Sequence, residues 1–222
     1  MNSQEKEQKN NNMNFLKLGN SIKDKNLAKD FDFVKEYEKI FIENIKRNGA
    51  RETLQWLKAT DFFIAPASTV FHGNFQGGLV EHCVWVYWRF CKLAEMEYGR
   101  GFVRNQAESL AIIALLHDVC KIDCYHVRMK NVKVDGAWES QPYYAFEENL
   151  PYGHGEKSVY LISKYMKLTE EEAIAINWHM GAFDARVKNN SSILSHAFEI
   201  YPLALLFHMA DYGSSYFDEK RR

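Results

Sequence analysis

An uninterrupted apolar run, Leu110–Leu116, ends at a histidine and an aspartate, His117 and Asp118. A helix that is apolar nearly all round must be surrounded by the rest of its domain. The run therefore predicts a central buried helix with His117 and Asp118 at its end. A lone carboxylate at such a position faces a desolvation cost of several kcal/mol unless a cation or a metal ion pairs with it. The fold has to provide Asp118 with such a partner.

Two other apolar segments present polar groups in the same way. Asp211 follows the largely apolar segment Leu203–Ala210, and His82 lies on the apolar stripe of another predicted helix. A single histidine on an apolar face is usually a hydrogen-bonded core residue, but two histidines and two acids together are harder to explain as packing. Imidazole nitrogens and carboxylate oxygens together suit a divalent transition metal. The predicted metal ligands are His82, His117, Asp118 and Asp211.

Apolar residues recur with helical spacing over most of the chain. The predicted helices cover residues 31–49, 51–60, 79–98, 106–120, 155–166, 170–180 and 199–217. The pattern changes between Tyr125 and Phe146, where β-rich segments flank Asp135-Gly136, a dipeptide typical of tight hairpin turns. The sequence therefore predicts an all-α protein with a small β-hairpin insertion.

The length of 222 residues suffices for one domain with a sizeable core. Residues 1–28 are polar and indicate a flexible tail, which leaves one domain over residues 29–222. The formal net charge of −1 gives no global sign of binding to nucleic acid or to an anionic membrane. No apolar run approaches the ~20 residues that span a bilayer, and the N-terminus does not resemble a secretory signal. Four cysteines without a CxxC pair fit free thiols in a reducing compartment, so we expect a soluble cytoplasmic protein with no membrane partner.

Three short motifs resemble those of a known family. They are Gly77–His82 (GGLVEH), Leu115–Lys121 (LLHDVCK) and His208–Asp211 (HMAD). Their order and separations are similar to those of the HD-domain metal-dependent phosphohydrolase superfamily, over about two thirds of the chain. The resemblance implies an HD-domain helical bundle at residues 71–217, preceded by a helical extension at residues 29–70. It also implies that the four predicted ligands surround one divalent transition metal: Mn, Fe, Ni, Co or Zn.

Two further histidines, His154 and His179, lie between the second and third motifs. HD subfamilies with two metals place extra histidines in this interval, and the aspartate of the His-Asp pair bridges their ions. The resemblance thus suggests that His154 and His179 complete a second metal site, so that one or two ions are bound in all. Substrate contact and helix capping are the alternatives for these two histidines.

Lys121 follows His117 by four residues, so its ammonium group could reach a phosphate beside the metal. A lysine here resembles the phosphodiesterase-like and exoribonuclease-like branches of the superfamily, whereas its nucleoside monophosphatases usually carry glutamate. The branch motifs are incomplete, because Cys120 stands where a glycine is usual and Met180 where a second histidine is usual. The choice between a monoester and a diester substrate therefore stays open.

The resemblance implies a phosphohydrolase that cleaves a phosphate ester or diester in a nucleotide or short nucleic acid. The metal would lower the pKa of a bound water from 15.7 toward roughly 7, and Asp118 and Lys121 are the expected catalytic residues. The possible substrate contacts are His72, Glu81, Asp184 and Arg186. Solvated surface charge is the alternative for these four. The alternative function is a catalytically silent nucleotide-sensing or protein-interaction module, against which the intact ligand set argues.

Overall fold

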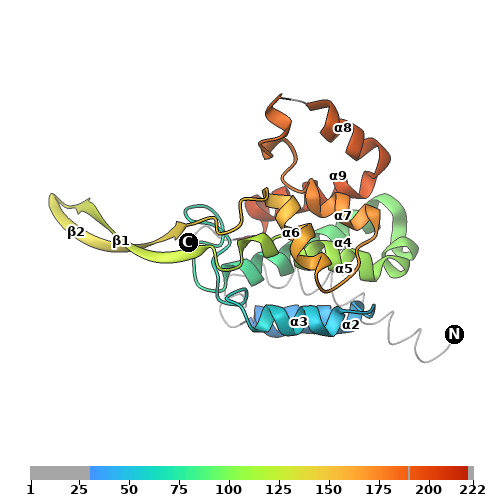
Figure 1. Ribbon diagram of the computed structural model, residues 1–222, viewed down its shortest axis with the longest axis horizontal. Helices are drawn as coiled ribbons and strands as arrows, with labels where there is room; N and C mark the ends of the chain where they lie inside the picture. Colours follow the sequence, from blue (N-terminus) through green and yellow to red (C-terminus); the bar gives the residue numbers. More distant parts are fainter. Residues whose placement is uncertain (1–30, 190, 220–222) are drawn as a thin grey trace.

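The computed structural model describes residues 31–189 and 191–219, and the predicted tail at residues 1–28 lies outside them. The described residues form α-helices, one hairpin and the segments that connect them, the longest of which covers residues 59–77 between α3 and α4 (Figure 1). The helices are α2 (Phe33–Asn44), α3 (Ala50–Lys58), α4 (Gly78–Asn105), α5 (Ala107–Leu116), α6 (His154–Ser163), α7 (Glu170–Asn177), α8 (Ser191–Ile200) and α9 (Pro202–Phe217). The 3-10 turns are η1 (Val119–Lys121), η2 (Gly181–Phe183) and η3 (Val187–Asn189). The predicted all-α fold with a small hairpin is confirmed.

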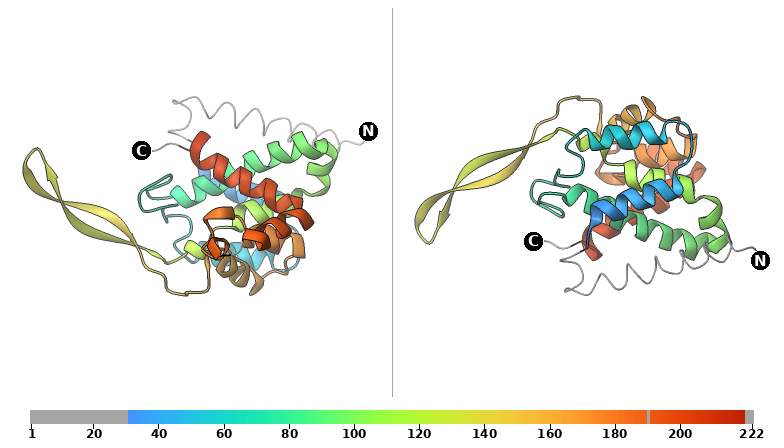
Figure 2. Two further views of the ribbon diagram at one scale, coloured as in Figure 1. Left: turned by 90° about the horizontal axis from the view of Figure 1, so that it is seen from above. Right: turned by 90° about the horizontal axis from the view of Figure 1, so that it is seen from below.

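Helix α5 lies at the centre of the bundle, as its apolar sequence predicts. Every residue of Leu110–Leu116 is 0% exposed, and α5 packs against α2, α4 and α7 (Figure 2). The buried Tyr37 hydroxyl donates a hydrogen bond to the Leu115 carbonyl oxygen at 2.9 Å, near the end of α5. The end of this helix, and with it the His-Asp pair, is therefore held from several sides.

The hairpin consists of β1 (Tyr125–Val134) and β2 (Ala137–Phe146), and it extends away from the helices (Figures 1 and 2). Its antiparallel register joins Tyr125 to Phe146 at the base and Val134 to Ala137 at the tip. Asp135 and Gly136 have φ values of 49° and 89°, the left-handed conformation that a two-residue hairpin turn of this type requires.

Several predicted helix boundaries were wrong, and two of the errors concern the helices that carry predicted metal ligands. The predicted helix over 106–120 ends at Leu116, and the chain then forms the separate 3-10 turn η1. The predicted helix over 199–217 is also two helices, because Glu199 belongs to α8. Pro202 disfavours helical backbone at Tyr201, which has φ −123° and ψ 78°, and Pro202 itself begins α9, where its missing N–H costs nothing.

Among the described residues, no single helix is long and apolar enough to cross a membrane. The pair Ser192–Ile200 and Pro202–Phe217, which is bent by 111°, meets that test of length and composition only when its two helices are taken together.

Candidate metal centre

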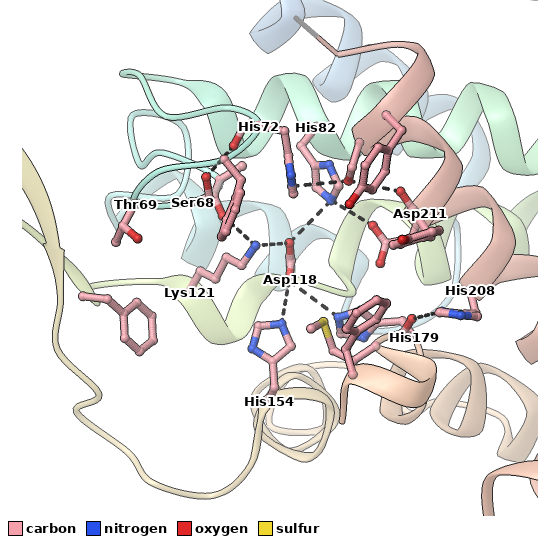
Figure 3. A pocket seen from close by; sticks show the side chains of 18 of the residues that line it. Ser68, Thr69, His72, His82, Asp118, Lys121, His154, His179, His208 and Asp211 are labelled. Atoms are coloured by element: carbon pink, nitrogen blue, oxygen red, sulfur yellow. Dashed lines mark hydrogen bonds and ion pairs between the residues drawn. The ribbon is translucent and has the colours of Figure 1, made fainter. Parts of the chain in front are cut away.

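Histidine and aspartate side chains from several helices meet beside the end of α5 (Figure 3). Four of them, including Asp118, are at most 2% exposed. The six residues are His82 (α4), His117 and Asp118 (after α5), His154 (α6), His179 (after α7) and Asp211 (α9). The structure thus brings together all six residues that the sequence predicts as first or second metal ligands.

The first group of donor atoms is built around Nε2 of His82. This atom lies 3.1 Å from Nε2 of His117, 3.3 Å from Oδ1 of Asp211 and 3.6 Å from Oδ2 of Asp118. Nε2 of His117 lies 3.5 Å from the same Asp118 oxygen and 3.9 Å from Asp211. Ligand atoms that share one ion at about 2.0–2.2 Å are separated by roughly 3–4 Å, so the spacing fits a shared metal ion.

The second group lies on the other oxygen of Asp118. Its Oδ1 is 3.0 Å from Nε2 of His154 and 3.7 Å from Nε2 of His179. The Asp118 carboxylate therefore stands between two sets of imidazole nitrogens, with one oxygen directed to each set.

Backbone carbonyl groups fix the tautomers of two of these histidines. Nδ1 of His117 donates a hydrogen bond to the Ala114 oxygen at 2.9 Å, and Nδ1 of His179 donates to the Ile176 oxygen at 2.6 Å. The proton on Nδ1 leaves the lone pair of Nε2 directed at Asp118 and its neighbours. Nε2 of His179 is buried and has no hydrogen-bond partner within the described part of the chain. A buried, unpaired imidazole lone pair is what a metal ion requires, so this donor set fits a divalent metal.

The family model for the HD domain matches residues 79–213, which is more than half of the chain. The chain belongs to the HD-domain family. Its superfamily consists of metal-dependent phosphohydrolases, so a divalent metal and hydrolase chemistry are the general properties of this HD domain. The comparisons with curated proteins and with solved structures gave no match.

One buried acid at the metal centre, Glu219, belongs to none of the three sequence motifs and lies just beyond the matched HD domain. Oε1 of Glu219 accepts a hydrogen bond from Nδ1 of His82 at 2.8 Å and another from the Ser214 hydroxyl at 3.0 Å. Glu219 follows the last motif and stands in a charged segment, which in the sequence indicates an exposed chain end. Only the return of the chain after α9 brings Glu219 to His82.

Lys121 supplies a positive charge next to the Asp118 carboxylate. Its Nζ lies 2.7 Å from Oδ2 of Asp118 and donates a second hydrogen bond to the Ala67 oxygen at 2.7 Å. Burial would raise the pKa of Asp118, but the charge of Lys121 outweighs it and holds that pKa well below its usual range. Asp118 is therefore ionised, as a metal ligand must be.

The charge on the histidines differs across the centre. Burial lowers the pKa of His82, but the charges of Glu219 and Asp211 outweigh it and raise this pKa to about 10. Burial lowers the pKa of His179 to about 3. A proton on His82 thus balances the charges of Glu219 and Asp211, and a bound metal ion would displace that proton.

The metal centre forms the floor of a cavity of about 520 Å³. Its polar lining includes Lys121, His72 and the hydroxyl groups of Ser68 and Thr69 (Figure 3). The apolar part of its wall is mostly aromatic and consists of Phe71, Tyr125, Phe146, Phe183, Tyr212 and Tyr216. The floor of the cavity can therefore bind phosphate and metal, and its aromatic walls can bind a flat organic group.

Three of the possible substrate contacts are not among the described residues that line this cavity: Glu81, Asp184 and Arg186. Arg186 instead forms ion pairs with Asp184 at 2.6 Å and with Glu156 at 2.5 Å. His72 does line the cavity. His208, which belongs to the third motif but was not predicted as a ligand or a substrate contact, lines it too, and Nδ1 of His208 donates to the His179 oxygen at 2.7 Å.

Proposed function

We propose that this HD domain hydrolyses a phosphate ester or diester bond in a nucleotide or a short nucleic acid. The observation that carries the proposal is the position of Asp118, whose two oxygens face two sets of imidazole nitrogens at the floor of a partly aromatic cavity. The first group of donor atoms consists of Nε2 of His82 and His117 and one carboxylate oxygen each of Asp118 and Asp211.

Those four residues would hold one divalent ion, and His154, His179 and Asp118 would hold a second. A divalent ion here supplies a Lewis acid for phosphoryl oxygens and lowers the pKa of water. The nitrogen and oxygen donors suit Mn²⁺, Fe²⁺, Co²⁺, Ni²⁺ or Zn²⁺. The hydrogen bonds at Nδ1 of His117 and His179 hold each ring in the orientation that ligation needs.

Lys121 would bind the scissile phosphate. An ammonium group has three hydrogens, and the contacts of Lys121 with Asp118 and the Ala67 oxygen use two of them. The remaining hydrogen can be donated to a phosphoryl oxygen, where it would stabilise the negative charge that develops during hydrolysis. The contacts with the buried Asp118 and with the Ala67 oxygen hold the Lys121 ammonium group in position.

The aromatic wall supports a nucleotide over a simple phosphate. Phe183 stacks with Tyr212 at a ring distance of 5.4 Å, and Tyr212 packs on Tyr216 at 4.9 Å, so flat rings stand together at one side of the cavity. A nucleobase binds such rings by stacking. The cavity volume of about 520 Å³ lies within the usual range for small-molecule sites.

The two-sided position of Asp118 favours a diester. Two ions about 3.5–4 Å apart can bind both the attacking and the leaving oxygen of an in-line displacement, which suits phosphodiester cleavage. Lys121 also supports a diester, because a lysine at this position is similar to the phosphodiesterase-like branch of the superfamily.

The test is a panel of nucleoside monophosphates, cyclic nucleotides and oligoribonucleotides, each assayed with Mn²⁺, Fe²⁺, Co²⁺, Ni²⁺ or Mg²⁺. We expect metal-dependent release of product from at least one class. His117→Ala, purified in the same way, controls for contaminating phosphatases. No turnover of any substrate with any metal would contradict the proposal. Tight nucleotide binding without product would instead indicate a nucleotide-sensing module.

A further inference from the structure

The two faces of the β1–β2 hairpin differ in chemistry. In an antiparallel pair, directly opposed residues point to the same side, and successive pairs alternate between sides. The register therefore places five opposed pairs on one side, and the six residues of this side nearest the base form what we call the apolar hairpin face: Tyr125, Val127, Met129, Pro142, Tyr144 and Phe146. The opposite side, which we call the charged hairpin face, carries His126, Arg128, Lys130, Glu139, Gln141 and Tyr143, together with Val132, Val134, Ala137 and Ala145.

The apolar hairpin face is open to solvent. Val127 is 67% exposed, Met129 59% and Phe146 45%. A hairpin of two strands is only marginally stable in water, and contiguous exposed apolar side chains usually mark a binding surface. The face is thus suited to be covered by a ligand.

The face is continuous with the cavity above the metal centre. Tyr125 and Phe146, the pair at the base of the hairpin, both line the cavity. The Tyr125 hydroxyl donates to the Ala67 oxygen at 3.1 Å, and this same oxygen accepts from Lys121. The apolar hairpin face therefore begins beside the ammonium group that would bind phosphate, and it leads away from the helical bundle along the projecting hairpin (Figure 1).

We propose that the apolar hairpin face binds the part of the substrate beyond the scissile phosphate, and that this substrate is a single-stranded oligonucleotide. The inference rests on the proposed function, because it takes the cavity as the place of hydrolysis. Strands of ten residues extend for roughly 30 Å, which is far longer than a mononucleotide. A substrate that uses this surface must continue well outside the cavity.

The order of side chains along the hairpin favours an oligonucleotide over a second protein. Rings of Tyr125, Phe146 and Tyr144 come first, and such rings stack with any base. The same side continues toward the tip with Asn131 opposite Ser140 and then Lys133 opposite Trp138. Amide, hydroxyl and ammonium groups among rings match the base edges and phosphates of a nucleic acid.

Two adjacent tyrosines give a matched test. Tyr144 lies on the apolar hairpin face and Tyr143 on the charged hairpin face, and both are partly buried. The probe is a fluorescent phosphorothioate oligoribonucleotide of about ten nucleotides, which resists hydrolysis, added to metal-loaded protein and followed by anisotropy. We expect Tyr144→Ala to raise Kd about tenfold, as for the loss of one stacked base, and Tyr143→Ala to leave Kd within about twofold.

Equal effects of the two variants on Kd, or no binding by the wild type, would overturn the inference. A change in sedimentation of Tyr144→Ala without a change in Kd would also overturn it, since the face would then bind a second copy of the chain. Hydrolysis of bis(p-nitrophenyl) phosphate by the wild type reports on the proposed function separately. If that hydrolysis occurs while Kd is insensitive to Tyr144, the hairpin inference alone fails.

Discussion

Glu219 accepts a hydrogen bond from Nδ1 of His82 at 2.8 Å, while Nε2 of the same ring lies 3.3 Å from Asp211. A carboxylate that holds the far nitrogen of a metal-binding histidine fixes the tautomer and makes the ring a stronger ligand. Glu219 and His82 thus form one unit at the metal centre, although 136 residues lie between them in the chain.

Removal of this carboxylate should weaken metal binding. We expect Glu219→Ala to lower the metal affinity by about 10- to 100-fold, the usual effect of losing such a partner. Glu219→Gln should cost less, because its amide oxygen can still accept from Nδ1 of His82. Competition with a chromophoric chelator measures both affinities without any assay of turnover.

The neighbouring Asp218→Asn is the matched control, because the Asp218 carboxylate forms an ion pair with Arg89 at 2.5 Å. Its metal affinity should equal that of the wild type. If Glu219→Ala binds metal as tightly as Asp218→Asn, Glu219 does not orient His82.

Lys121→Ala should separate catalysis from metal binding. The ammonium group contacts Asp118 but is not itself a ligand, so its removal should leave the metal content unchanged. We expect kcat to fall about 10²–10³-fold, as for the loss of one group that stabilises transition-state charge. Lys92→Ala, on an exposed part of α4, is the control for both measurements. Joint loss of metal and activity in Lys121→Ala would assign Lys121 a structural role.

The second group of histidines predicts the metal stoichiometry. We expect elemental analysis of protein purified without chelator to give about two metal ions per chain, and about one in His154→Ala and in His179→Ala. His196→Ala is the control, since the His196 side chain is 71% exposed. A ratio near one that does not change in these variants would leave His154 and His179 as substrate contacts.

Metal removal should lower the thermal stability. An ion that binds only the folded chain stabilises it by about 2.7 kcal/mol when its concentration is 100 times Kd. For a domain of this size, that change shifts Tm by roughly 5–10 °C. Calorimetry with and without EDTA measures the shift, and His117→Ala should show a much smaller one. A chelator-independent Tm in the wild type would count against a bound metal.

The sequence was sufficient for the fold class and for the six histidines and aspartates that gather beside the end of α5. Polar groups at the ends of apolar helices, such as Asp118 and Asp211, have to meet where those helices meet, because each needs a partner in the interior. The dipeptide Asp135-Gly136 likewise sufficed for the hairpin turn. Both features follow from short stretches of sequence: an apolar run that ends in a polar residue, and a turn dipeptide between two strands.

Features that depend on contacts between distant segments could not be predicted. Glu219 has the sequence surroundings of a solvated residue, and only the packing after α9 buries it. His208 lines the cavity through its contact with the His179 oxygen, which the spacing of residues along α9 does not reveal. Lys121 was expected one helical turn beyond His117, but it reaches Asp118 through the 3-10 turn η1.

The most direct test of the metal centre is anomalous diffraction from crystals of the wild-type protein grown or soaked with Mn²⁺. We predict an ion about 2.0–2.3 Å from Nε2 of His82 and His117 and from carboxylate oxygens of Asp118 and Asp211. Binding of manganese at any other place in a catalytically active crystal, with these four side chains left without an ion, would contradict the account.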